Sequence, residues 1–380
     1  MIIATDRAHR DEARRVLEIC NACRYCEGLC ATFQAMTLRR SFTDGDVDYL
    51  ANLCHHCTAC YHDCQYAPPH SFDVNVPAVL TDSRVDSYAR YAWPAAWGRL
   101  FQGNGLVVSL VTAVVLSLTL GLAMALIGGD ALYGRHSGPG AFYAVVGHGL
   151  MVLAAGATFG FSVLALAVSV VRYWRAIAPG AGWPRLSDVL AATGNAATMK
   201  YLDGGHGEGC SSADDGFSNQ RRWFHQATMW GFLLCFASTC VATVYHYGLE
   251  RVAPYAVFSV PVLLGTAGGI GLVVGPVGLL WHKVHSHSGP VRLRHLGMDY
   301  AFLVSLLLVS LTGLLLLALR ETSAMGTTLV VHLGFVLAFF VLLPYSKFVH
   351  GIYRFAALVR FAQERRLSGV AVAGGEHAGR

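Results

Sequence analysis

The sequence predicts a mainly α-helical protein in which an N-terminal helical module precedes a bundle of six membrane-spanning helices. Two observations support this fold class. A four-cysteine motif occurs twice within the first 64 residues, and long apolar runs dominate the chain beyond residue 99. Of the 380 residues, 54% are hydrophobic and only 13% are charged, which is the composition of a membrane protein.

The two cysteine motifs share the spacing C-x2-C-x2-C-x3-C, and each cysteine of the second lies 34 positions after its counterpart in the first. This spacing is typical of ferredoxin-type proteins whose thiolates bind two [4Fe–4S] clusters. Three closely spaced cysteines can bind one cluster, while the fourth reaches the neighbouring one. The predicted ligand sets are Cys20, Cys23, Cys26 and Cys64 for the first cluster, and Cys54, Cys57, Cys60 and Cys30 for the second.

Zinc and disulfides are the alternative uses of these cysteines. Structural zinc sites rarely need a third C-x2 step and a fourth cysteine, given twice. Disulfides are disfavoured by the close spacing and by the lack of a signal peptide before the motifs. Ala31 and Gln65 replace the proline that usually follows the fourth cysteine, which weakens the match to the small bacterial ferredoxin fold. We interpret His55, His56 and His62 as residues that tune hydrogen bonding to the clusters.

Helical segments lead into both cysteine motifs. Asp6–Ile19 has helical character, and Phe42–Leu53 carries acidic residues near its start, as a capped helix does. We therefore expect residues 1–99 to form a helical, ferredoxin-like cluster domain.

Six apolar runs follow, each long enough to cross a bilayer, which takes about 20 residues. They are Leu106–Ile127, Ala141–Val171, Ala227–Tyr245, Ala256–Trp281, Tyr300–Leu319 and Thr327–Val349. We predict a membrane domain over residues 100–350, with a polar loop over 172–224, and a tail over 351–380. Within this tail, Tyr353–Leu367 mixes apolar and basic residues and fits an amphipathic segment on the anionic inner leaflet.

The glycine-rich fourth run, between Gly265 and Gly278, has no strand before it and lies inside an apolar span. We interpret its glycines as small residues that let helices pack closely, and not as a nucleotide-binding loop.

Positive charges predict the orientation of the spans. Three alternate loops carry only one arginine each: Arg135, Arg251 and Arg320. Most other basic residues lie in the remaining loops, before the first span and after the last. This pattern predicts that both termini, the cluster domain and the loop 172–224 lie in the cytoplasm. It also predicts that the spans lie in the inner membrane. This bias accounts for the net charge of +5, so the charge gives no indication of nucleic-acid binding.

Histidines near the ends of two spans predict b-type haem. His332 and His350 are 18 residues apart, five helical turns or about 27 Å on one helix. His225 and His246 flank the antiparallel third span. We therefore predict one or two bis-histidine haems, the inner bound by His225 and His350 and the outer by His246 and His332. His148 is the alternative ligand for the outer haem and His282 for the inner one.

The loop Asp203–Cys210 combines His206 and Glu208 with several glycines. It is a candidate for contact with quinone or with the cluster domain, and a mobile loop without a role is the alternative.

The chain resembles the tricarballylate utilization protein B family, also called citrate utilization protein B. The segments that carry the resemblance are Lys200–Cys210, Arg221–His225, Gly297–Tyr300, Leu319–Thr322 and Pro344–Gly351. The last is also similar to the end of a haem helix in the haem-binding subunit of respiratory nitrate reductases. The resemblance implies a protein that reoxidises the FAD of a cytoplasmic tricarballylate dehydrogenase and passes the electrons, through iron–sulfur clusters and haem, to acceptors in the membrane. Because the spans lie where quinone diffuses, we expect quinone as the acceptor.

Two other functions remain open. The chain has the same centres as an electron-transfer subunit for another flavoprotein or for a thiol–disulfide reductase. A transporter with a regulatory metal domain is an alternative of a different class, but transporters usually place ionisable groups at the bilayer midplane. No nucleophile–base pair or phosphate loop is visible in the sequence, so we expect an oxidoreductase component without an active site for an organic substrate.

Overall fold

A computed structural model of the chain describes residues 2–102, 105–204, 207, 209–211, 216–286, 289 and 293–369. These residues are mainly helical, which confirms the predicted fold class; the short strands are β1 (Cys210–Ser211) and β2 (Phe217–Ser218). The chain divides into two compact units. Unit 1 contains Met1–Ser87, Val170–Ser211 and His350–Arg380, and unit 2 contains Tyr88–Ser169 and Ser212–Val349.

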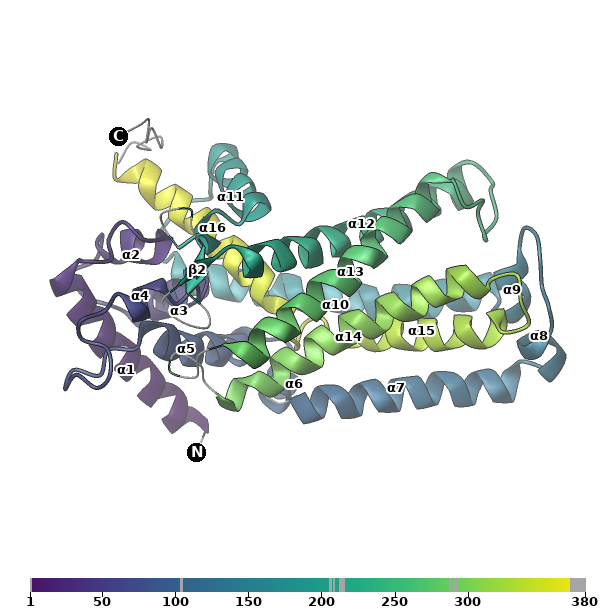
Figure 1. Cartoon of the computed structure of the whole chain (residues 1–380), viewed down its shortest axis with the longest axis horizontal. Helices are drawn as coiled ribbons and strands as arrows, with labels where there is room; N and C mark the ends of the chain where they lie inside the picture. Colours follow the sequence, from purple (N-terminus) through teal and green to yellow (C-terminus); the bar gives the residue numbers. More distant parts are fainter. Residues whose placement is uncertain are drawn as a thin grey trace. The chain divides into compact units, whose positions relative to one another are not determined.

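Unit 1 is built mainly of helices (Figure 1). They are α1 (Ile2–Cys23), α2 (Ala31–Met36), α3 (Asp44–Leu53), α4 (Ala59–His62), α5 (Val76–Tyr91), α11 (Leu186–Thr198), the 3-10 helix η1 (Lys200–Leu202) and α16 (Val349–Leu367). The predicted cap of α3 is present. The Thr43 side chain accepts a hydrogen bond from the Asp46 backbone N–H, and the Asp46 carboxylate accepts one from the Thr43 backbone N–H.

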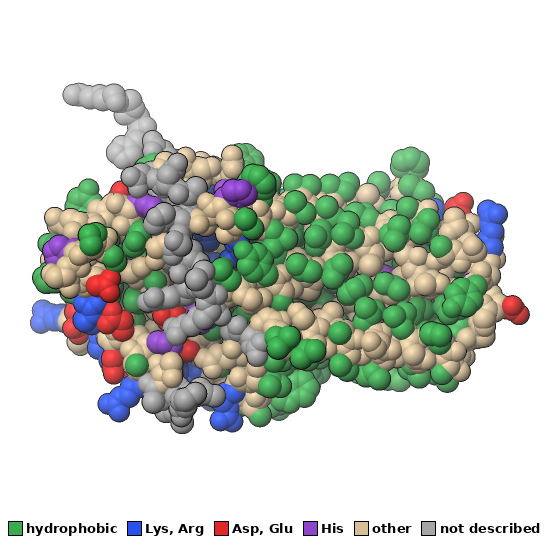
Figure 2. Space-filling view, turned by 60° about the horizontal axis from the view of Figure 1, so that its bottom comes forward, with side chains coloured by type: hydrophobic (Ala, Val, Ile, Leu, Met, Phe, Trp, Pro, Cys, Tyr) green, Lys and Arg blue, Asp and Glu red, His purple; other side chains and the backbone are tan. Residues whose placement is uncertain are grey.

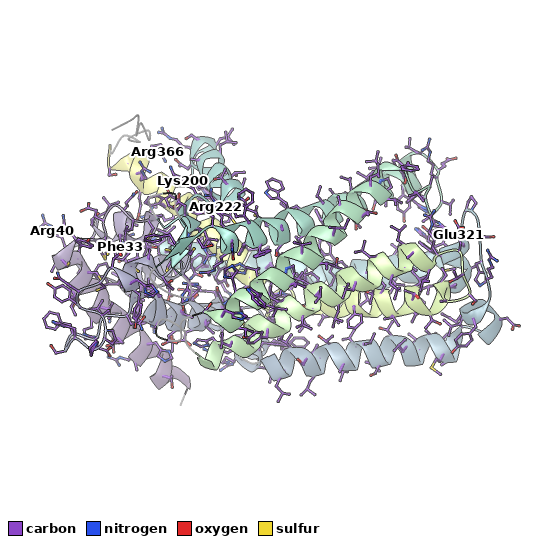
Figure 3. The ribbon with its side chains drawn as sticks, viewed as in Figure 1. Phe33, Arg40, Lys200, Arg222, Glu321 and Arg366 are labelled. Atoms are coloured by element: carbon purple, nitrogen blue, oxygen red, sulfur yellow. The ribbon has the colours of Figure 1, made fainter. Side chains whose placement is uncertain are left out.

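Helix α16 is part of the core of unit 1. The rings of Tyr173 and the fully buried Tyr353 stack with centroids 4.6 Å apart. Two ion pairs hold the same helix, Arg39 with Glu364 at 2.6 Å and Arg366 with Asp188 of α11 at 2.8 Å; Figure 3 labels Arg366. The prediction that the apolar face of this tail lies on the inner leaflet is therefore wrong, because protein side chains already cover it.

Unit 2 contains long apolar helices, which Figure 1 draws as extended coiled ribbons. Its elements are α6 (Ala95–Phe101), α7 (Gly105–Leu126), α8 (Gly129–Tyr133), α9 (Ala141–Val145), α10 (His148–Ile177), α12 (Gln220–Gly248), α13 (Val260–His285), α14 (Leu293–Leu319) and α15 (Met325–Leu342); the last turns of α10 belong to unit 1. Six of them, α7, α10, α12, α13, α14 and α15, are long and apolar enough to cross a membrane, as predicted. Hydrophobic side chains cover much of the face of these helices in Figure 2.

Two predicted spans are interrupted in the structure. The run Thr327–Val349 is not one helix, because α15 ends at Leu342 and α16 begins at Val349, with Pro344 between them. Proline lacks the N–H that a helix interior requires and disfavours helix in the residue before it. His332 and His350 therefore lie on different helices, and their spacing does not place them on one face. Similarly, the run Ala141–Val171 is divided, because α9 ends at Val145 and α10 begins at His148, so His148 is the first residue of the helix that can span the membrane.

The glycines of α13 let this helix approach α12 closely, as predicted. A Cβ atom added to Gly268 would lie 2.7 Å from the backbone oxygen of Gly231, and one added to Gly271 would lie 2.9 Å from that of Ala227. Such contacts leave no room for a side chain.

Replacing Gly275 by valine should separate α12 from α13. Its Cβ atom would lie 2.6 Å from the backbone nitrogen of Thr228 and 2.7 Å from the backbone oxygen of Phe224. Overpacking of this kind costs about 1–3 kcal/mol, so thermal melting of the detergent-solubilised protein should occur at lower temperature. Gly121→Val in α7 is the matched control, because an added Cβ there meets no heavy atom within 4 Å. Equal melting of the two variants would contradict this account of the glycines.

Candidate iron–sulfur and haem sites

The first cysteine-lined cavity of unit 1 has a volume of about 240 Å³. Cys20 and Cys23 reach it from the last turn of α1, Cys26 from the turn that follows, and Cys64 from the end of the segment after α4. These are the four residues of the first predicted ligand set. Cys60 also borders the cavity.

A second, narrower cavity is lined by the other predicted set, Cys30, Cys54, Cys57 and Cys60. Phe33, Cys60 and Val76 line both cavities, so one layer of side chains separates them. Phe33, labelled in Figure 3, belongs to α2, which begins directly after Cys30. The two motifs thus exchange their fourth cysteines between the cavities.

The donor atoms of both cavities fit iron–sulfur clusters. Burial raises the pKa of Cys20 and Cys26 to about 12 and that of Cys30 to about 11. These thiols stay protonated unless a metal binds them as thiolates. Among the described residues, no three His, Cys, Asp or Glu side chains converge as a single metal ion requires. Four cysteines of one predicted set line each cavity, which is the number of thiolates that a cubane takes, because each cysteine binds a different iron.

Polar residues surround the second cavity. His55 and His56 line it. The Nδ1 atom of His55 lies 2.8 Å from the Leu53 carbonyl oxygen, and that of His56 lies 3.1 Å from Thr81 Oγ1. His62, in contrast, lines neither cavity. Arg354 of α16 donates a hydrogen bond of 2.8 Å to the carbonyl oxygen of Cys54. This contact was not predicted, because 300 residues separate the two partners in the sequence.

In unit 2 the structure pairs His246 with His148. Their imidazole rings stack with centroids 4.1 Å apart and planes 20° apart, beside Tyr143 and Tyr247. The predicted partner His332 lies on α15, where its Nδ1 atom is 3.1 Å from Thr312 Oγ1. Among the described side chains, no ring contact joins His246 to His332. The alternative ligand named from the sequence is therefore the one that lies beside His246.

The candidates for the inner haem belong to different units. His225 lies near the start of α12 in unit 2, and His350 lies in the first turn of α16 in unit 1. The alternative ligand His282, in the last turn of α13, lies edge-on to Phe224 with ring centroids 5.9 Å apart. His206 and Glu208, the candidates for quinone contact or docking, lie outside the described residues.

An ionic cluster in unit 2 was not predicted. Asp299 of α14 pairs with Lys283 of α13 at 2.5 Å and with Lys347, in the turn after α15, at 2.8 Å. The cluster ties three segments of the bundle together. Its members are far apart in the sequence. Each one alone looks like an ordinary charged residue near the end of a span, so the sequence did not indicate that they meet.

Paired cysteine cavities and six apolar helices define a multi-pass membrane protein with an iron–sulfur domain. Comparison with known proteins agrees. The family model "Citrate utilization protein B Fer4-like domain" matches residues 13–90, and the model "Citrate utilization protein B" matches residues 100–371. The chain is also 50% identical to the citrate utilization protein B of Escherichia coli over 355 residues, which cover 93% of this chain and 92% of that protein. No solved structure matches the chain.

The chain belongs to the citrate utilization protein B family. Its Fer4-like domain indicates an iron–sulfur protein with a role in electron transfer.

Proposed function

We propose that this chain takes electrons from the reduced FAD of a cytoplasmic dehydrogenase and passes them through two [4Fe–4S] clusters and b-type haem to membrane quinone. The observation that carries the proposal is the pair of adjacent cavities, each lined by the four cysteines of one predicted set, which come from both motifs. When bound, the clusters and haem supply one-electron chemistry. The chain supplies the thiolates, the imidazoles and the short separation between the cavities.

Tricarballylate dehydrogenase is the partner that we propose. The support for it is the resemblance noted in the sequence, and the related protein of Escherichia coli is named for citrate utilization. We also propose that the spans lie in the inner membrane with both termini in the cytoplasm, because basic residues follow the positive-inside pattern. This orientation would present unit 1 to a cytoplasmic flavoprotein.

The proposed haem ligands follow from the histidine geometry. His148 and His246 are the proposed ligands of the outer haem, because of the histidines named from the sequence His148 is the one whose ring lies beside His246, with centroids 4.1 Å apart. His350 and His225 remain the proposed ligands of the inner haem. His350 has a further feature in its favour: it lies one helical turn before Arg354, which contacts the backbone of the ligand Cys54.

The metal content of anaerobically purified protein tests the proposal. Two complete clusters predict about eight non-haem irons and eight acid-labile sulfides per chain, together with the low-spin absorption of reduced b-type haem. Stoichiometric zinc without sulfide would exclude the clusters, and an optical spectrum without haem bands would exclude the haem.

A further inference from the structure

The two cysteine-lined cavities of unit 1 differ in their exposure and in their contacts with α16, and this difference indicates the direction of electron flow. The inference rests on the proposed function. We infer that the Cys20–Cys23–Cys26–Cys64 site receives electrons from the flavoprotein, which contacts Tyr25 and Phe72. The Cys30–Cys54–Cys57–Cys60 site then delivers them toward α16.

The first cavity lies at the protein surface. Cys23 is exposed, and Tyr25, which lines the cavity, is 74% exposed. Phe72 is 47% exposed, and its ring lies 5.4 Å from the ring of Tyr66, another lining residue. A donor protein can therefore bring a flavin close to this site by covering two aromatic side chains. Exposed aromatic residues of this kind are common anchors of protein interfaces.

The second cavity lies deeper in unit 1. Cys54, Thr58 and Tyr201 of its lining are buried. Phe33 and Val76, also buried, separate it from the first cavity. A donor protein that binds at the first cavity therefore cannot contact the second site directly. One layer of side chains separates the two sites.

Two contacts join the second site to α16, and we take this helix as the route by which electrons leave the site. Arg354 donates its hydrogen bond to the Cys54 carbonyl, and Tyr201 contacts Phe361 edge-on with centroids 5.9 Å apart. His350, a proposed haem ligand, lies four residues before Arg354 on the same helix and so on the same face.

The number of electrons that the two sites can accept equals the number that a reduced flavin releases. A flavin hydroquinone that becomes oxidised releases two electrons and two protons. The cysteines of each site hold a centre that takes up one electron, so the two sites together accept both, and the protons leave to water at the donor. Electrons that reach the second site are passed on one at a time to haem and then to quinone.

The depth of the two centres can be measured without any partner. We would add a dysprosium chelate to the reduced holoprotein and record how much it speeds the spin relaxation of each cluster. Cys20→Ser and Cys57→Ser assign the two signals, since each variant perturbs one site. The signal assigned to the Cys20 site should respond several-fold more strongly. An equal response, or a stronger response at the Cys57 site, would overturn the inferred direction.

A kinetic experiment tests the docking residues. The probe is tricarballylate dehydrogenase reduced by tricarballylate, and the variants are Tyr25→Ser and Phe72→Ser. Each should slow reduction of the clusters by about tenfold, as loss of an aromatic anchor does, while reduction by dithionite stays unchanged. Trp183→Ser is the matched control, because Trp183 is 89% exposed and lines neither cavity.

Other outcomes have distinct meanings. If Trp183→Ser slows the reaction as much as the other two variants, or if Tyr25→Ser and Phe72→Ser instead reduce binding to lipid vesicles or dissociate a dimer, the docking assignment is wrong. If the dehydrogenase fails to reduce the wild-type protein, the proposed donor fails, and the relaxation measurement still decides the direction.

Discussion

Replacing Cys64 by serine should destroy the cluster bound by Cys20, Cys23 and Cys26, although Cys64 belongs to the other motif. The reason is that Cys64 lines the first cavity together with these residues. The non-haem iron content should fall from about eight toward about four per chain if the cluster is lost completely, and the electron paramagnetic resonance signal of the remaining cluster should persist.

Cys30→Ser should have the reciprocal effect on the cluster of Cys54, Cys57 and Cys60. Cys240→Ser is the control, since Cys240 is an exposed cysteine of α12 outside both motifs. Loss of the Cys54 cluster in the Cys64→Ser variant would contradict the exchange of fourth ligands and would favour one cluster per motif.

Replacing His246 or His148 by alanine should remove the outer haem. The two rings lie beside one another and would supply the two imidazoles that a bis-histidine haem takes, and a single remaining histidine could not supply both. If the chain binds two haems, the haem content of either variant should fall by about half, as measured by the pyridine haemochrome assay.

His332→Ala is the decisive comparison for this assignment. His332 lies beside Thr312 and not beside His246, so its replacement should leave the haem content unchanged. If His332→Ala loses haem while His148→Ala keeps it, the pair inferred from the sequence is the correct one.

Local patterns predicted much of the molecule. The cysteine spacing groups the residues that line each cavity, because three of every four ligands lie within seven residues of one another. The six apolar helices follow from hydrophobicity and length alone. The cap of α3 follows from Thr43 and Asp46, three residues apart.

Features that depend on distant contacts were not predicted. The tail looked amphipathic, but only the tertiary structure shows that Tyr173 and Arg39 cover it. The break at Pro344 lies inside a hydrophobic run, where hydropathy does not reveal it, and it invalidated the common face of His332 and His350. His148 was named as an alternative, yet its position relative to His246 depends on how α10 packs near α12.

Rapid mixing tests the central claim most directly. Tricarballylate dehydrogenase, reduced by its substrate, would be mixed anaerobically with the chain in lipid nanodiscs that contain ubiquinone. The account predicts that the iron–sulfur absorption bleaches first, reduced haem bands follow, and ubiquinol then accumulates with two electrons per oxidised FAD. If the clusters and haem stay oxidised in this mixture, although dithionite reduces them, transfer from flavin to quinone through this chain is contradicted.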